Sequence, residues 1–182
     1  MDEAMTHLTP DEERILKIAN GDRDALSTMY LQHKGAVFGF ALSMLHDRER
    51  AEDVMQETFI QLWNSAASYI PRGKEPLSWL LGITKNLALR RLRTDSLSVS
   101  IPEEHSAPAD PLDHYLAVEN KLILRAVLTK LSEEEQQIVL LHAVSGLKHR
   151  EIADLLDMPL STVLNKYRRA LQKLKKLLGE SI

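Results

Sequence analysis

The chain has 182 residues, with 23 Lys or Arg against 26 Asp or Glu, and it contains no cysteine. This length allows one or two small domains, and the lack of cysteine excludes disulfides, thiolate catalysis and cysteine-ligated zinc. The N-terminus is acidic and the longest apolar run is far too short to span a bilayer, so we expect a soluble, cytoplasmic protein without direct membrane insertion.

Charge is segregated along the chain. Residues 1–61 hold twelve acids and six bases, residues 72–93 hold six bases and one acid, and residues 94–119 hold six acids and no base. A second basic segment lies near the C-terminus. Two basic islands separated by acidic stretches therefore describe the chain better than its net charge of -3, and such islands are typical of nucleic-acid contacts.

Helical periodicity extends through nearly the whole sequence, and strand-like alternation is almost absent. We therefore predict an all-α fold. The helices expected in the first half cover residues 10–20, 23–45, 51–65 and 77–93. Asp47 is expected to cap or precede the third of them, and a loop at residues 71–76 comes before the fourth.

The third predicted helix has an apolar face built around Val54, Phe59 and Leu62. Its polar face is rich in acids and amides, namely Glu52, Asp53, Gln56 and Gln61. On its own, this polar face has the composition of an ordinary solvated surface.

The fourth predicted helix changes from apolar to basic along its length. Trp79 comes early, and Arg90, Arg91 and Arg93 follow near the end. An aromatic ring can stack on a base while cations hold phosphates, so this helix suits single-stranded or opening DNA. A core tryptophan followed by cations at a helix C-terminus explains the same residues equally well.

Residues 94–113 are rich in Ser and Pro and have few apolar anchors, so we predict a domain linker between a domain at 1–93 and a domain at 114–182. Helices are expected to resume at about residues 112–130. A capping box of Ser132 and Glu135 then predicts a helix that ends at Gly146.

The C-terminal part has the pattern of a helix-turn-helix. Ile152, Leu155 and Leu156 give a first helix one apolar stripe, which residues 157–159 end, and Ser161 is expected to cap a second helix. The expected apolar back of the second helix consists of Val163, Tyr167, Leu171, Leu174 and Leu178. Residues 142–178 carry eight Lys or Arg against three acids, which favours a DNA reader over a solvated basic helix.

The order of these segments resembles bacterial RNA polymerase sigma factors of the sigma-70 family, extracytoplasmic-function (ECF) group, which keep only the second and fourth sigma regions. The resemblance rests on residues 51–63 and 76–86, followed by a linker and the terminal helix-turn-helix. It extends over about residues 24–178. It implies a sigma factor that directs promoter-specific transcription initiation and performs no catalysis.

The resemblance also implies partners and sites. Core RNA polymerase would be bound through its β′ clamp and β flap, with Asp53, Gln56 and Glu57 at positions that match clamp contacts. The positions that match −10 promoter contacts are Trp79, Asn86, Arg90, Arg91 and Arg93. The loop at residues 68–75 falls where such factors hold a flipped base, a step that costs a few kcal/mol.

The −35 element would be read by the terminal helix-turn-helix. The residues at matching positions are Lys148, Ser161, Thr162, Leu164, Asn165, Lys166, Arg168 and Arg169. An acidic linker in such factors passes toward the RNA exit path, although an ordinary tether has the same composition. Factors of this group commonly serve stress or envelope responses and are held inactive by an anti-sigma protein.

The sequence departs from the family pattern at three places. Arg90 stands where an acid is usual, Leu164 stands where a base is usual, and Lys148-His149 replaces the common Ser-Tyr. These changes bear on the promoter sequence rather than on the fold. Leu164 is suited to contact a thymine methyl group.

Two other classes of protein are alternatives. An ordinary helix-turn-helix regulator would bind a palindrome as a dimer, but no heptad seam is long enough to hold one. An enzyme or metalloprotein is disfavoured because the seven histidines are scattered and no His-Glu-x-x-His or paired carboxylates occur at ligand spacing. We therefore expect no metal, no cofactor and no small-molecule substrate.

Overall fold

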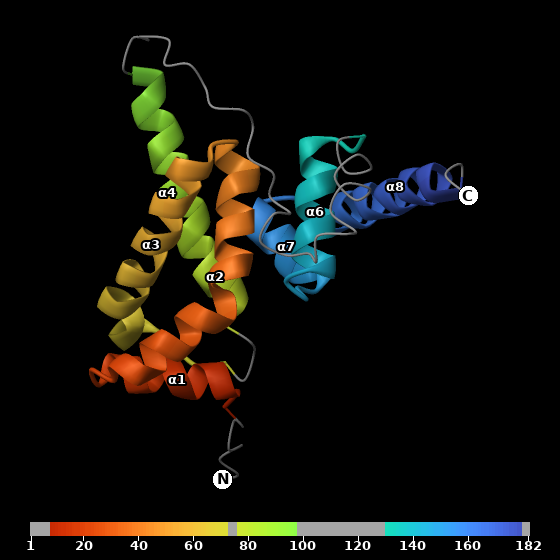
Figure 1. The fold of residues 1–182 in the computed structure, drawn as a ribbon. Helices are drawn as coiled ribbons and strands as arrows, with labels where there is room; N and C mark the ends of the chain where they lie inside the picture. The colour runs from red at the N-terminus through yellow and green to blue at the C-terminus, as the bar shows by residue number, and fades with distance from the viewer. Residues whose placement is uncertain (1–7, 73–75, 98–129, 180–182) are drawn as a thin grey trace.

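The computed structural model describes residues 8–72, 76–97 and 130–179. These ranges are helical and contain no strand, which confirms the all-α prediction (Figure 1). The elements are α1 (Pro10–Ala19), α2 (Arg23–Leu45), α3 (Arg48–Ser65), a 3-10 turn η1 (Ala66–Ser68), α4 (Leu77–Leu97), α6 (Glu133–Ala143), α7 (His149–Leu156) and α8 (Leu160–Gly179).

Side-chain caps explain where several helices begin. Asp47 accepts a hydrogen bond from the backbone N–H of Arg50, so α3 starts at Arg48, three residues before the predicted position. Ser132 and Glu135 form the predicted capping box at α6, with the Ser132 N–H 2.9 Å from the Glu135 carboxylate. Both caps were therefore predicted correctly.

Two further predicted boundaries differ from the structure. The helix α4 continues to Leu97, which takes it into the predicted linker, and the rest of that linker and the helix predicted at 112–130 lie outside the described residues. The helix α6 ends at Ala143. Gly146, predicted as its end, lies in the following turn at φ +71°, a conformation that suits glycine.

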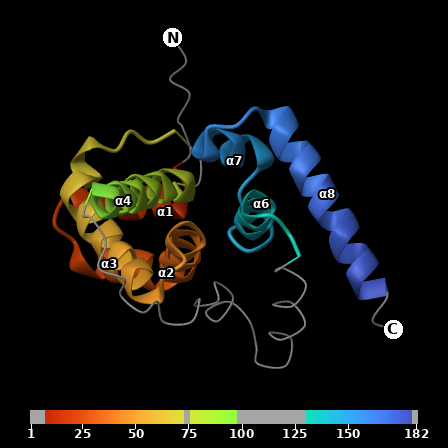
Figure 2. The same ribbon diagram turned by 90° about the horizontal axis from the view of Figure 1, so that it is seen from above.

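Helix α2 is the centre of the first half. It packs against α1, α3 and α4, and also against α6 from the C-terminal half (Figures 1 and 2). Its second half is therefore buried nearly all round, as an evenly apolar helix should be. The largest buried side chains there include Val37, Phe38, Phe40, Leu42 and Leu45.

A buried polar cluster joins α1 to α2. One Asp11 carboxylate oxygen lies 2.6 Å from His33 Nε2, and Arg14 pairs with the other oxygen. Burial raises the pKa of Asp11, but the hydrogen bonds and charges of His33 and Arg14 lower it further, so that its pKa lies below the ordinary value. The carboxylate is therefore a charged anchor between the two helices.

The described part of the C-terminal half, residues 130–179, contains α6, α7 and α8, with α6 between α2 and α8 (Figure 2). The prediction of Leu171 in the apolar back of α8 was wrong, because Leu171 is 44% exposed while Ala170 is fully buried. At about 100° per residue, Ala170 lies about 20° from Val163 around the helix and Leu171 about 80°. The helical period therefore places Ala170, and not the larger Leu171, on the buried side of α8.

Candidate nucleic-acid interface

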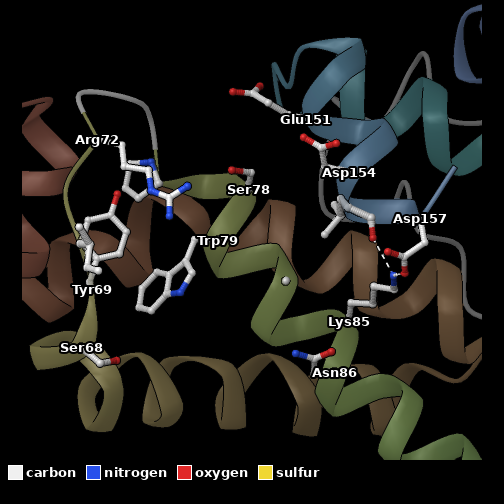
Figure 3. Close-up of a pocket in the computed structure, with 14 residues that line it drawn as sticks. Ser68, Tyr69, Arg72, Ser78, Trp79, Lys85, Asn86, Glu151, Asp154 and Asp157 are labelled. Carbon is white, nitrogen blue, oxygen red and sulfur yellow. Dashed lines mark hydrogen bonds and ion pairs between the residues drawn. The ribbon is translucent and has the colours of Figure 1, made fainter. Parts of the chain in front are cut away.

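A cavity of about 650 Å³ opens beside the first half of α4 (Figure 3). One side of it is an aromatic corner in which the rings of Tyr69 and Trp79 lie 4.8 Å apart between centroids. The other residues that line it from this side are Ser68, Ile70, Arg72, Pro76, Ser78, Gly82, Lys85 and Asn86. Its other side is lined by Leu155 and by the carboxylates of Glu151, Asp154 and Asp157. The rings, amide and cations on the first side match the requirements of a site for an unstacked base.

The loop that forms this corner is held from below by Glu12, a fully buried residue of α1. Its carboxylate accepts hydrogen bonds from the Arg72 N–H at 2.6 Å, from the Tyr69 hydroxyl at 3.2 Å and from the Thr9 N–H at 3.0 Å. The α1 capping box and the loop therefore share one carboxylate. Sequence patterns missed Glu12 in this role because its partners Tyr69 and Arg72 are 57 and 60 residues away.

Four of the five residues predicted to contact the −10 element share one face of α4. Trp79, Asn86, Arg90 and Arg93 follow one another at helical spacing. Trp79 lines the first cavity, Asn86 lines both it and a second hollow of about 590 Å³, and Arg90 and Arg93 line the second. This face of α4 is therefore a continuous strip from the aromatic corner to the arginines.

Arg91, the fifth residue, points toward α3 instead. Its guanidinium lies 3.3 Å from Glu57 and 3.8 Å from Asp53, and Arg90 also reaches Glu57, at 3.0 Å. Glu57, which the sequence placed with the polymerase contacts, is thus the partner of two predicted DNA contacts. These pairs are partly exposed, so each adds little stability, but they fix where the arginines point.

The outer face of α3 is exposed as predicted. Asp53 and Gln56 both lie there, together with Gln61. Ile60 is 61% exposed on the same face, and the sequence reading missed it. Its spacing, four residues after Gln56, places it on the same face of the helix and was the signal that could have found it.

The turn between α7 and α8 has the geometry of a helix-turn-helix. Asp157 ends α7 in the left-handed region at φ +54°, which Asp tolerates better than most residues, and the Met158 N–H bonds to the Ala153 carbonyl at 2.9 Å. The prediction that Ser161 caps α8 was wrong. The helix begins at Leu160, and the Pro159 carbonyl accepts the hydrogen bond of the Val163 N–H.

Most residues predicted to contact the −35 element lie on the exposed surface of α8 or at the start of α7. Arg168 donates to the Asn165 side chain at 2.7 Å, which orders two neighbouring polar groups. The exposed members of the set are Lys148, Ser161, Leu164, Asn165, Arg168 and Arg169, while Thr162 is half-buried. Lys166 is half-buried and turns toward α6, where it pairs with Glu134.

A second ion pair joins the C-terminal half of α8 to α6. Lys173 Nζ lies 2.6 Å from the carboxylate of Glu135, the same buried residue that completes the α6 capping box. Burial raises the pKa of Glu135, but the Lys173 ammonium and the Ser132 N–H lower it further, so that it lies below the ordinary value. The two ion pairs therefore hold α8 against α6 and leave its other face exposed.

His149 lies in an aromatic cluster inside the helix-turn-helix. Its ring centroid is 4.2 Å from that of His142 and 4.7 Å from that of Tyr167, and its Nε2 atom is buried without a hydrogen-bond partner. Burial, together with the charge of His142, lowers the pKa of His149 below 6.5. His149 therefore packs as a neutral ring.

We expect acid to destabilise this half of the molecule through His149. Because the unfolded chain takes up the proton more readily than the folded chain, stability is complete above about pH 6.5 and falls below it. In thermal unfolding between about pH 7.5 and pH 5.5, His149→Phe should lose part of this dependence. A His149→Phe variant that keeps the full wild-type pH dependence would contradict the assignment.

Two other kinds of site are not found in the part of the chain that the structure describes. No group of three or more His, Asp or Glu residues there could hold a metal ion. Among the same residues, no helix has both the length and the apolar character needed to cross a membrane.

Both halves of the chain match known protein families. Residues 29–97 match Sigma-70 region 2, and residues 121–174 match Sigma-70 region 4. The ECF RNA polymerase sigma factor SigK of Mycobacterium sp. (strain KMS) is 25% identical over 181 residues, covering 96% of this chain and 94% of the relative. SigK of Mycolicibacterium vanbaalenii is 27% identical over 184 residues, covering 94% and 91%.

Two solved structures share the fold. CnrH, solved in complex with the cytosolic domain of CnrY, superimposes with a TM-score of 0.60 at 20% identity, covering 94% of this chain and 99% of CnrH. The sigma factor RpoE of Bartonella quintana, solved with the anti-sigma factor NepR, gives a TM-score of 0.59 at 24% identity, covering 84% and 96%. With its regions 2 and 4 in this order, the chain belongs to the sigma-70 family of RNA polymerase sigma factors and is of the ECF type.

Proposed function

We propose that this sigma factor directs promoter-specific transcription initiation by dividing three tasks among α3, α4 and α8. The observation that carries the proposal is the pairing of two DNA-competent surfaces in one chain: the cavity and arginine strip of α4 in region 2, and the exposed helix α8 in region 4. Two such surfaces on one monomer suit a promoter with two separated elements.

The −10 element is assigned to α4 and the loop before it. Trp79 and Tyr69 offer ring faces on which an extruded base can stack, and Asn86 supplies an amide for its edge. Arg90 and Arg93 lie farther along the same face, where they would hold the phosphates of the separated strand. Stacking and phosphate contacts together lower the cost of opening the duplex without ATP.

The −35 element is assigned to α8, lying in the major groove. Asn165 is exposed on its outer face and can donate to base edges, and Leu164 can meet a thymine methyl group. Arg168, Arg169 and Lys148 are exposed cations that are placed to hold phosphates. In this assignment Lys166 must leave Glu134 before it can reach DNA.

Core RNA polymerase is assigned to the outer face of α3, through Asp53, Gln56 and Ile60. An exposed Ile beside a carboxylate and an amide gives this face an apolar anchor with a polar rim, the usual composition of a protein interface. Region 4 is expected to contact the β flap. Because relatives of this fold have been solved with CnrY and with the anti-sigma factor NepR, we include an anti-sigma protein among the partners.

Asp53→Arg is the variant that tests the docking assignment. Reversing the charge at an exposed position should weaken binding to core RNA polymerase at least about tenfold, while leaving the unfolding midpoint within about 2 °C of the wild type. Binding can be measured by fluorescence anisotropy of a labelled sigma factor titrated with core enzyme. Glu13→Arg makes the same charge change at an exposed position on α1 and should bind normally. If both variants bind core enzyme equally well, the α3 assignment is wrong.

A further inference from the structure

Helix α4 contains a glycine at a position where alanine would be more stable. Gly82 lies inside the helix, away from both ends, and it lacks the positive φ of Gly21 and Gly146. Glycine in a helix interior destabilises the folded chain relative to alanine, because its backbone loses more freedom on folding. The backbone conformation of α4 therefore gives no reason for a glycine at this position.

Packing gives no reason for the glycine either. A Cβ added to Gly82 would meet no heavy atom of the described residues within 4 Å, its own turn of the helix apart. Gly82 lines the cavity beside α4, and the free space next to it belongs to that cavity. The fold would therefore accept a methyl group here and would gain stability from it.

Gly82 lies in the middle of the α4 face that lines this cavity (Figure 3). At about 100° per residue, Trp79 and Asn86 lie about 60° and 40° from it to one side around the helix. Ser78 and Lys85 lie about 40° and 60° from it to the other side. The glycine is therefore a gap between two pairs of side chains, where the helix backbone is bare.

The spacing of the neighbouring side chains determines what can lie over this gap. Trp79 and Asn86 are seven residues apart, about 10.5 Å along the helix axis, and Gly82 lies between their levels. A nucleobase that stacks on the Trp79 ring and bonds to the Asn86 amide must therefore cross the level of Gly82. Because no Cβ stands there, the flat face of the base can contact the backbone of α4 directly.

We propose that Gly82 is a specificity-determining residue of the −10 site, where the missing side chain lets an unpaired nucleobase lie directly against the backbone of α4. The inference rests on the proposed −10 role of this helix. The requirement at residue 82 is the absence of a side chain, so even a residue that the fold accepts would oppose binding. The helix gives up stability at this point in return for access by the base.

A series of side chains at residue 82 separates this role from a structural one. Gly82→Ala and Gly82→Leu should keep the unfolding midpoint or raise it by up to about 4 °C, because both residues are better helix formers. Their holoenzymes should bind a single-stranded −10 oligonucleotide from a mapped promoter about fivefold and at least about twentyfold more weakly than wild type. A lower midpoint for Gly82→Ala, or wild-type affinity for Gly82→Leu, would overturn the inference.

Ser27→Leu is the matched control for the added side chain. It places a leucine at an exposed position of α2 that lines neither cavity beside α4. Its holoenzyme should bind the oligonucleotide within about twofold of wild type, as expected for a surface substitution. All three variants should bind core RNA polymerase normally in the anisotropy titration. If Ser27→Leu weakened oligonucleotide binding as much as Gly82→Leu, the effect would not belong to residue 82 and the inference would fail.

Removing the bases of the oligonucleotide one at a time identifies the group that lies on Gly82. Where the abasic nucleotide replaces that base, wild type and Gly82→Leu should bind within about twofold of each other, because the contact that the leucine obstructs is gone. The same ratio of affinities at every abasic position would overturn the inference. A wild-type holoenzyme that binds a scrambled oligonucleotide as tightly as the −10 oligonucleotide would instead refute the −10 role of α4.

Discussion

Replacing Arg168 and Arg169 together with Ala is expected to weaken promoter binding by the holoenzyme about tenfold and to flatten its salt dependence. Each lost phosphate contact reduces the slope of log K against log salt by about 0.9, so the double variant should lose about 1.8. Both arginines are exposed on α8. The Lys173–Glu135 ion pair holds α8 against α6 and does not involve either arginine, so the change should not disturb the fold. Anisotropy titrations of labelled promoter DNA between about 50 and 200 mM salt would measure both quantities.

The control for this prediction is Lys175→Ala, which removes an exposed cation from α8 about two turns farther along. It should change affinity less than about twofold and leave the slope nearly unchanged. A double variant with the wild-type slope would show that α8 does not meet phosphates at these positions. If the double variant lost contacts with the −10 element and kept those with the −35 element, the assignment of the two arginines to the −35 element would be wrong.

Glu12→Ala is expected to reduce the free energy of unfolding by about 2–4 kcal/mol and to impair −10 recognition. The substitution leaves the N–H groups of Thr9 and Arg72 and the Tyr69 hydroxyl without the buried carboxylate that now accepts their hydrogen bonds. Each abandoned buried donor costs about 1–3 kcal/mol, and Arg72 can recover part of that cost from water. Tyr69 would also lose the contact that holds its ring against Trp79.

Urea denaturation would measure the stability loss, and 2-aminopurine fluorescence in the −10 element would measure promoter opening. Glu13→Ala, at the next position on α1, removes an exposed carboxylate and should change neither result appreciably. Glu12→Gln retains one acceptor and should fall between the wild type and Glu12→Ala. If Glu12→Ala were as stable as Glu13→Ala, the shared Glu12 carboxylate would not contribute to the free energy of unfolding.

Local rules in the sequence predicted most of the helices. Apolar periodicity and side-chain caps such as Asp47 and Ser132 act over three or four residues, and that is the range within which a sequence pattern can be read. The errors also have local causes. Leu171 was assigned to the apolar back of α8 because it is apolar and lies eight residues after Val163, whereas Ala170, seven residues after Val163, lies nearer to Val163 around the helix and is the buried residue.

The features that shape the candidate site arise mostly from contacts between distant segments. Glu12 meets a loop about 60 residues away, and Lys85 meets Asp157 at a separation of 72 residues. Nothing in the local sequence distinguishes either residue from an ordinary surface charge. Glu57 is a related case: it lies on the polar side of α3, but the approach of α4 turns it toward Arg90 and Arg91.

Glu57 fixes the orientation of two of the arginines proposed to contact the −10 element. Without a nearby carboxylate, Arg90 would be a free cation. Glu57 lies 3.0 Å from Arg90 and 3.3 Å from Arg91, so one acid on α3 serves both. The polar face of α3 thus has an inner part, Glu57 and Asp53, that pairs with the arginines of α4, and an outer part around Gln56 and Ile60 that is exposed.

Run-off transcription with purified core RNA polymerase tests the central claim most directly. Genomic fragments can be transcribed with core enzyme alone and with core enzyme plus this protein, and the 5′ ends of the transcripts mapped. We predict new transcripts with discrete start sites, preceded by a shared pair of elements at −10 and −35, and loss of these transcripts with Asp53→Arg. Transcripts that start at the same positions with core enzyme alone, or no specific transcript from any fragment, would contradict the account.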